Sequence, residues 1–258
     1  MKIDYIQNGD CYELIKSLPD NSVDLVITDP PYEFTTGGGG GAFGVKNRDY
    51  RAEYLALYHE TGTTKETERL RINAGKVQSR NNIAHLSKGF DLSLLDELDR
   101  VMKKINIYIW CSKAQVQKLL AHYENKGCAI DILTWNKTNP TPTCNNTYLS
   151  DTEYCIFARE KGVKLYGNYD TKHKYYVSPT NKADKDKYKH PTIKPLGIIN
   201  NLIINSSNEG DIVLDPFIGS GTTAVACQYT NRHYIGFELD ETYYQTAIKR
   251  VEENSYLL

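Results

Sequence analysis

The sequence has little net charge and lacks long apolar runs. Lys and Arg total 31 against 32 Asp and Glu, which gives a formal net charge of -1. No global field marks the chain as a nucleic-acid binder, so any basic surface must be local. No apolar run approaches the ~18 residues that a membrane helix needs. The start MKIDYIQNGD also lacks the apolar core of a signal peptide. We therefore expect no membrane partner.

Cysteine pairs and repeats are also absent. The six cysteines are scattered and form no CxxC pair, which argues against structural zinc and against a disulfide scaffold. We therefore expect a reduced, cytoplasmic protein without a metal site. The chain has 258 residues, 40% of them hydrophobic, and no internal repeat. It can bury a sizeable core, as one large domain or as one domain with an insertion.

Short β-branched runs alternate with helical patterns along most of the chain, which predicts an α/β sheet. The predicted strands are 23–29, 106–110, 131–137, 153–160, 211–217 and 233–239, and the predicted helices are 93–104, 113–126, 195–207, 222–230 and 241–254, with a short helix in DCYELIKSLPD. Two segments, 33–90 and 161–190, fit neither pattern. The second interleaves lysines with tyrosines. Its composition suits either a solvated surface loop or a phosphate-contacting surface with stacking aromatics.

A glycine turn near the C-terminus, VLDPFIGSGTT (213–223), is typical of nucleoside binding. A predicted strand ends at Asp215 and a helix starts at Thr222. Between them Gly219 and Gly221 permit close backbone approach, and the hydroxyl of Ser220 or Thr222 is expected to cap the helix. The next strand ends in Glu238, an acid placed to bind ribose hydroxyls. Because the third glycine of the dinucleotide pattern is missing, a nucleoside without pyrophosphate is favoured. A purely structural turn is the alternative.

The stretch DPPY (29–32) ends another predicted strand. Its prolines fix the backbone and remove two N–H donors. The Asp29 carboxylate and the Pro30 carbonyl are left as acceptors, and Tyr32 adds a flat ring. Two acceptors and a stacking ring suit a planar base with an exocyclic amine, which is adenine or cytosine. A turn that simply ends the strand is the alternative.

Together, DPPY (29–32), HPTIKP (190–195), DPFIGSGTT (215–223) and GFELD (236–240) resemble the amino-group DNA methyltransferases that use S-adenosylmethionine. The catalytic motif comes first, as in their β subgroup, whose motif order is circularly permuted. The resemblance covers residues 1–32 and about 100–258. It implies a Rossmann-like methyltransferase fold, with a mixed, mostly parallel sheet and helices on both faces. The whole chain, 1–258, would be one catalytic domain, with inserted target-recognition segments at 33–90 and 140–189.

The resemblance also implies roles for individual residues. Asp29 and Pro30 would accept the amino hydrogens of the target base, Pro31 would complete the motif, and Tyr32 would stack on the ring. Contacts to S-adenosylmethionine would come from Asp10, Cys11, Thr192, Lys194, Asp215, Phe217, Gly219, Ser220, Gly221, Thr222 and Glu238. Among these, Asp10 would lie near the adenine of the cofactor, and Glu238 would bind its ribose. Lys194 and Thr192 would lie near its methionine carboxylate. The segment TWNKTNPTP (134–142) would lie beside the target base. No metal is implied.

The resemblance favours N6 of adenine in double-stranded DNA, because Asp29 rather than serine opens the catalytic motif. Cytosine N4, an RNA substrate and a catalytically silent binding relative remain alternatives. Glutamine methylation usually goes with asparagine at this position, so Asp29 argues against it. A homodimer and a cognate restriction endonuclease stay open.

Residues that choose the target site are expected in the segments without resemblance. The run Gly37–Gly41 suggests a mobile flap over an extruded base, and an idle linker is the alternative. Candidate DNA contacts are Arg48, Arg51, Arg69, Arg71, Arg80, Lys172, Lys174, Lys182, Lys185, Lys187 and Lys189.

Overall fold

The computed structural model describes residues 1–33, 89–140, 142, 148–188, 190 and 192–255. The chain divides into two compact units, one formed by Met1–Pro30 with Phe90–Leu258 and the other by Pro31–Gly89. The second unit spans nearly the same residues as the insertion expected at 33–90.

The first unit is built on a mixed sheet whose strands lie in the order β1-β8-β7-β2-β3-β5-β4-β6. Neighbouring strands pair in parallel except at β5, which is antiparallel to both β3 and β4. The strands are β1 (Tyr5–Asn8), β2 (Leu25–Thr28), β3 (Asn106–Cys111), β4 (Ala129–Lys137), β5 (Thr152–Arg159), β6 (Tyr175–Ser178), β7 (Ile212–Asp215) and β8 (His233–Glu238).

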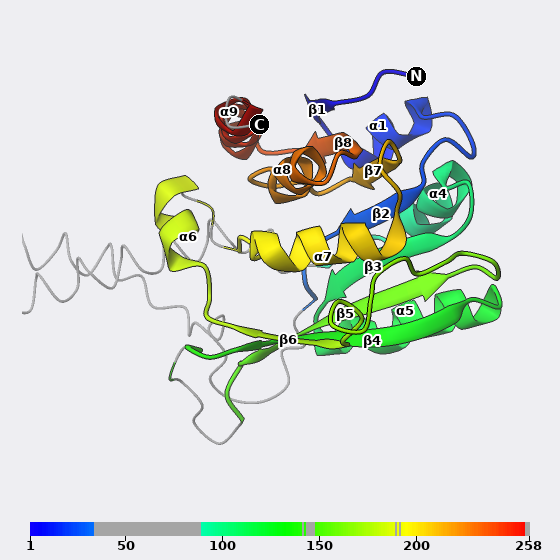
Figure 1. Cartoon of the computed structure of the whole chain (residues 1–258). Coiled ribbons are helices and arrows are strands. Elements are labelled where there is room, and N and C mark those ends of the chain that lie inside the picture. The colour runs from blue at the N-terminus through cyan, green and yellow to red at the C-terminus, as the bar shows by residue number, and fades with distance from the viewer. Residues whose placement is uncertain (34–88, 141, 143–147, 189, 191, 256–258) are drawn as a thin grey trace, which may run out of the picture. The chain divides into compact units, whose positions relative to one another are not determined.

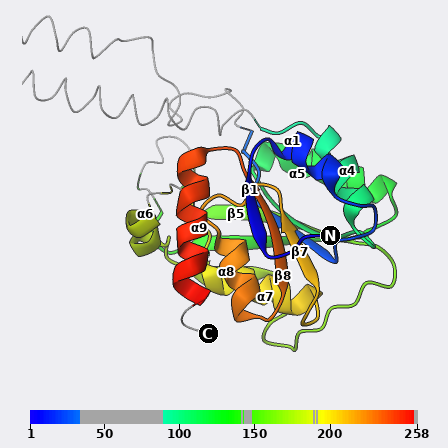
Figure 2. The ribbon, with the colours of Figure 1, turned by 90° about the horizontal axis from the view of Figure 1, so that it is seen from above.

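Helices cover both faces of this sheet (Figures 1 and 2). Helices α1 (Cys11–Leu14), α4 (Ser93–Val101) and α5 (Lys113–Asn125) lie on one face, and α7 (Leu196–Ser206), α8 (Thr222–Tyr229) and α9 (Glu241–Ser255) lie on the other. A 3-10 turn (Ile15–Ser17) follows α1, and α6 (Lys182–Tyr188) precedes α7. None of the described helices combines the length and the apolar character needed to cross a bilayer.

The central strands are buried on both faces, which explains their continuous apolar sequence. Every residue of β2 and of β3 is buried. On the side of α4 and α5, Val26, Ile107 and Leu214 pack with helix residues such as Leu95 and Leu119 in one core cluster. Helix α5 begins in a capping box, in which the Ser112 hydroxyl and the Gln115 side chain each bond the other residue's backbone N–H.

The parallel pairing brings several chain segments to one edge of the sheet. Strand β2 pairs with β7, with Val26 opposite Leu214, and β7 pairs with β8. The residues that follow β1, β2, β7 and β8 therefore emerge side by side at the carboxyl ends of these strands. Because β5 runs antiparallel, its first residues reach that same edge. Ligands of open α/β sheets bind at such an edge.

The predicted sheet and its helices on both faces are confirmed. The sequence patterns missed β1, β6 and α6. The strands β1 and β6 lie at the two ends of the sheet and are mostly not buried, and α6 is an exposed, lysine-rich helix, so all three have too few apolar positions to show a period. Residues 140–189 were expected as an inserted segment. That expectation needs correction, because β5 lies between β3 and β4 and belongs to the sheet itself.

Candidate active site

Asp29 follows β2 and is held by a lysine from a distant part of the chain. The Lys194 Nζ lies 2.5 Å from the Asp29 Oδ2. Lys194 sits in the TIKP segment just before α7, and its side chain is only 7% exposed. The Lys194 Nζ also lies over the Trp110 ring, 5.1 Å from the ring centroid. The sequence resemblance implied a place for Lys194 near the cofactor carboxylate, whereas in the structure its ammonium contacts Asp29.

A second acid, which the sequence analysis missed, shares this lysine. Glu153 comes from the start of β5, and its Oε2 lies 3.0 Å from the Lys194 Nζ. Its Oε1 lies 2.6 Å from the Nζ of Lys137, the last residue of β4. Burial raises the pKa of Glu153, but the two lysines outweigh it and lower that pKa to about 2. Burial lowers the pKa of Lys194, and the attraction of Asp29 and Glu153 more than reverses this and raises it.

The glycine turn after β7 has the backbone that its sequence predicts. Gly219 and Gly221 both have positive φ, +53° and +81°, a conformation that costs other residues about 1–2 kcal/mol. A Cβ on Gly221 would lie 3.2–3.3 Å from Ala247 of α9. A Cβ on Gly219 would lie 2.9 Å from the His190 ring. In this structure, the glycines thus allow close packing of α9 and His190 against the turn.

The expected helix cap is wrong, and Arg250 explains why. Gly221 is the N-cap of α8, and no side chain caps the helix there. The hydroxyls of Ser220 and Thr222 instead accept hydrogen bonds from the Arg250 guanidinium, at 3.2 and 2.9 Å, and the Ser220 carbonyl accepts another at 3.3 Å. Arg250 lies on α9 and is 2% exposed. It is a functional candidate that no local sequence pattern indicated.

Arg250 also contacts α6. Its guanidinium carbon lies 4.4 Å from the Tyr188 ring centroid, and its second terminal nitrogen lies 3.6 Å from an Asp184 oxygen. An ion pair between Lys187 and Glu253, at 3.3 Å, joins the same two helices. The end of the lysine-rich segment is therefore docked on α9 and, through Arg250, on the glycine turn.

Glu238 lies beside the glycine turn, as the βαβ pattern predicts. Its Oε2 accepts a hydrogen bond from the Gly219 N–H at 2.9 Å, and its Oε1 accepts one from the Asp240 N–H at 2.8 Å. Burial raises its pKa, which these backbone donors oppose. Asp10 follows the neighbouring strand β1 and caps α1 by accepting a bond from the Tyr12 N–H. The buried Cys11 comes next, and its pKa is raised to about 12 by burial and by Asp10.

Asp215 faces inward and organises the turn. Its carboxylate accepts bonds from the Thr223 hydroxyl, at 2.6 Å, and from the Phe217 N–H, at 3.1 Å. Burial raises its pKa to about 7. The Phe217 ring lies edge-on to Phe90, with centroids 6.4 Å apart. These two bonds tie the end of β7 to the turn and to α8, so Asp215 supports the shape of the turn.

The HPTIKP segment lies against the same turn. The His190 ring packs on Tyr243 of α9, with ring centroids 4.4 Å apart, and its Nδ1 accepts a bond from the Thr192 N–H at 3.3 Å. Burial, with the nearby cations Lys194 and Arg250, lowers the pKa of His190 to about 4. The imidazole is therefore neutral near pH 7.

The remaining predicted residues fall into three groups. Pro31 and Tyr32 belong to the second compact unit, and their roles stay predictions. Gly37–Gly41 and the five candidate arginines lie outside the described residues, as does Lys189. Among the candidate lysines, Lys174 pairs with Asp131. Lys185 is half-buried, and burial lowers its pKa, as do the nearby Lys137 and Lys194.

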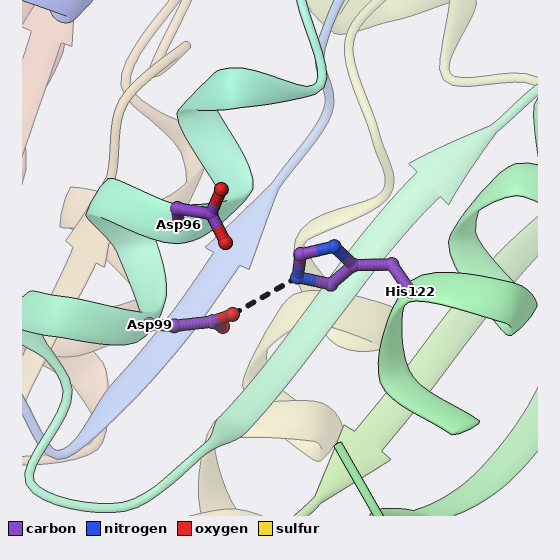
Figure 3. Close-up of side chains that lie close together, drawn as sticks. All are labelled: Asp96, Asp99 and His122. Atoms are coloured by element: carbon purple, nitrogen blue, oxygen red, sulfur yellow. Dashed lines mark hydrogen bonds and ion pairs between the residues drawn. The ribbon is translucent and has the colours of Figure 1, made fainter. Parts of the chain in front are cut away.

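Away from this edge, Asp96 and Asp99 of α4 and His122 of α5 form a group with metal-ligand chemistry (Figure 3). The Asp99 Oδ2 lies 2.9 Å from the His122 Nε2. The Lys126 ammonium lies 2.5 Å from that same oxygen and 3.1 Å from Asp96. Lys126 thus supplies the positive charge that a cation would bring, and we interpret the group as an ionic link between the two helices.

Comparisons with known proteins cover nearly the whole chain. A family model described as DNA methylase matches residues 23–249. The chain is 28% identical to the Type II methyltransferase M2.MboI of Moraxella bovis, over 96% of this chain and 87% of that protein. It is 29% identical to the Type II methyltransferase M2.DpnII of Streptococcus pneumoniae, over 95% of this chain and 88% of that protein.

Solved structures show the same fold. The M1.HpyAVI-SAM complex matches with a TM-score of 0.65 and 26% identity, over 95% of this chain and 98% of that chain. The cytosine-N4-specific PvuII DNA methyltransferase matches with a TM-score of 0.62, over 98% of this chain and 90% of that chain. At 16% identity, this second likeness concerns the fold alone. The methyltransferase fold expected from the sequence is confirmed.

Proposed function

Since the chain belongs to the DNA methylase family, we propose that it transfers a methyl group from S-adenosylmethionine to the N6 amine of an adenine in DNA. One observation carries this proposal: Asp29 follows β2, and the glycine turn follows β7, the strand directly beside it. A base held by Asp29 and a cofactor held by the turn would therefore meet at one edge of the sheet.

The residues at the strand ends fit S-adenosylmethionine. The Glu238 carboxylate lies at the turn, 2.9 Å from the Gly219 N–H, and a carboxylate has acceptor capacity for ribose hydroxyls as well. Asp10 follows β1, the strand beside β8, on the side where the adenine of the cofactor is expected. When bound, this cofactor supplies a methyl group already activated on a sulfonium sulfur. The remaining cofactor contacts that the sequence implies are part of this proposal.

The protein's own contribution is to orient the amine. The lone pair of an aromatic amine is delocalised into its ring, so the nitrogen is a weak nucleophile. The Asp29 carboxylate and the Pro30 carbonyl accept its two hydrogens, which favours a pyramidal nitrogen with its lone pair directed at the methyl group. Tyr32 stacks on the ring. The base must also leave the duplex, because its amine is otherwise paired.

Adenine is favoured over cytosine by Asp29 at the first position of the motif. Cytosine N4 is the second candidate, since its amine asks for the same two acceptors and one protein with this fold, the PvuII enzyme, is cytosine-N4-specific. The two substrates differ in ring size, and the pocket around Asp29 would have to differ with them.

The test is the Asp29→Ala variant, assayed with labelled S-adenosylmethionine and mixed-sequence duplex DNA. We expect methyl transfer to be lost while the cofactor Kd changes less than about tenfold, or ~1.4 kcal/mol. Asp24→Ala is the matched control, because Asp24 directly precedes the same strand at its other end. Its carboxylate pairs with Lys103 and accepts the Ile212 N–H, so this change should affect stability and not methyl transfer. A larger loss of cofactor affinity in Asp29→Ala would show that this acid serves the cofactor instead.

A further inference from the structure

Four charges alternate in a row at the base side of the proposed site. Asp29, Lys194, Glu153 and Lys137 follow one another at separations of 2.5, 3.0 and 2.6 Å. They come from the end of β2, the segment before α7, the start of β5 and the end of β4. Two negative and two positive groups leave the row without net charge. We call these residues the charge row.

Burial makes the balance of the charge row matter. The side chains of Lys194, Glu153 and Lys137 are 7%, 18% and 17% exposed. Taking an ion out of water costs several kcal/mol of stability unless the ion is paired, and removing one member of a buried pair leaves the charge of the other uncompensated. Lys194 alone on Asp29 would draw the carboxylate's electron density to itself. With Glu153 on its other side, the ammonium divides its hydrogen bonds between two acids.

We propose that Glu153 is a positioning residue that acts through Lys194 to keep the Asp29 carboxylate a strong acceptor for the target amine. This inference rests on the proposed function, since it concerns the same acid and the same amine. It assigns Lys194 to the base side of the site. The resemblance implied contact with the methionine carboxylate instead, and the two roles predict different losses on mutation.

The charge balance gives the direction of the effect. Glu153→Gln leaves two cations, Lys194 and Lys137, and one acid, Asp29, so the charge row carries one positive charge in excess. The half-buried Lys185 lies close to the same row. The excess positive charge then holds the Asp29 carboxylate more tightly, and its capacity to accept a hydrogen bond from the amine falls. The glycine turn and Glu238 are untouched, so cofactor binding should be retained.

The experiment measures single-turnover methyl transfer and the cofactor Kd on the full chain. For Glu153→Gln we expect the rate to fall at least tenfold, with the Kd within about threefold of wild type. Glu160→Gln is the matched control, because Glu160 is exposed and follows the other end of β5. It should change neither quantity.

The double variant Glu153→Gln/Lys137→Gln separates charge balance from a structural role. It removes one charge of each sign and leaves Asp29 paired with Lys194, so it avoids the buried excess charge that could unfold the single variant. We expect its rate to exceed that of Glu153→Gln.

Three results would overturn the inference. They are an unchanged rate in Glu153→Gln, a loss of cofactor affinity that matches its loss of rate, and a double variant that is no faster than Glu153→Gln. A wild-type chain that transfers no methyl group to DNA would instead refute the proposed function, and the inference with it.

Discussion

Replacing Arg250 tests whether α9 shapes the cofactor side of the site. In Arg250→Met, Thr222 loses its 2.9 Å bond and Ser220 loses two longer ones. Hydrogen bonds to charged groups contribute about 1.5–3 kcal/mol each. The two longer bonds contribute less, and both hydroxyls can rotate toward other partners, so we expect a total loss of about 3 kcal/mol of interaction free energy. Methionine retains part of the packing on Tyr188.

The loss should divide between stability and cofactor binding, because the turn that Arg250 holds is the proposed cofactor loop. If half of it appears in binding, the cofactor Kd rises about tenfold, since ~1.4 kcal/mol is a factor of ten. Denaturant unfolding and titration calorimetry measure the two parts. Lys249→Met is the matched control, because its side chain is 79% exposed. An Arg250→Met protein with wild-type stability and wild-type Kd would refute this reasoning.

Three further outcomes are expected. Gly221→Ala should lose about 1–2 kcal/mol of stability from the positive φ of this residue alone. Gly197→Ala in α7 should not, because a Cβ there meets nothing within 4 Å. Equal unfolding midpoints for the two variants would contradict this expectation. Lys172→Ala should weaken DNA binding and lower the salt slope of binding by about one. Lys187→Ala should have a smaller effect, because Lys187 already pairs with Glu253. Equal salt slopes for the two variants would argue against a DNA contact at Lys172. Folding lowers the pKa of His190 from 6.5 to about 4, so between these pH values the unfolded chain binds more protons than the folded one. The free energy of unfolding should therefore fall as the pH drops from 6.5 to 4. In pH-dependent denaturation, His190→Gln should make that fall smaller.

Local patterns were sufficient for the parts of the site that a strand and its turn create. Asp29 and the glycine turn were predicted because an acid or a glycine directly after an apolar run has a fixed place at the end of a strand. Once β2 and β7 pair in parallel, the two meet without further information. The place of Asp29 could thus be predicted from the sequence, but its contact with Lys194 could not.

Glu153 and Arg250 could not be predicted in this way. Glu153 reaches the strand ends only because β5 runs antiparallel, and sequence periodicity does not give the direction of a strand. Arg250 lies inside a helix with charged neighbours, where an arginine ordinarily faces water. Its burial depends on how α9 packs on α8 and on α6, and α6 was not predicted. Tertiary packing decides the role of both residues.

The identity of the methylated nucleoside is the sharpest test of adenine methylation by this chain. The purified chain would be incubated with labelled S-adenosylmethionine and mixed-sequence duplex DNA, and the DNA digested to nucleosides for chromatography and mass spectrometry. We expect the label in N6-methyldeoxyadenosine, and no label in the DNA with Asp29→Ala. Label in N4-methyldeoxycytidine would contradict the assignment to adenine, and no labelled nucleoside from a chain that binds the cofactor would contradict DNA methylation itself.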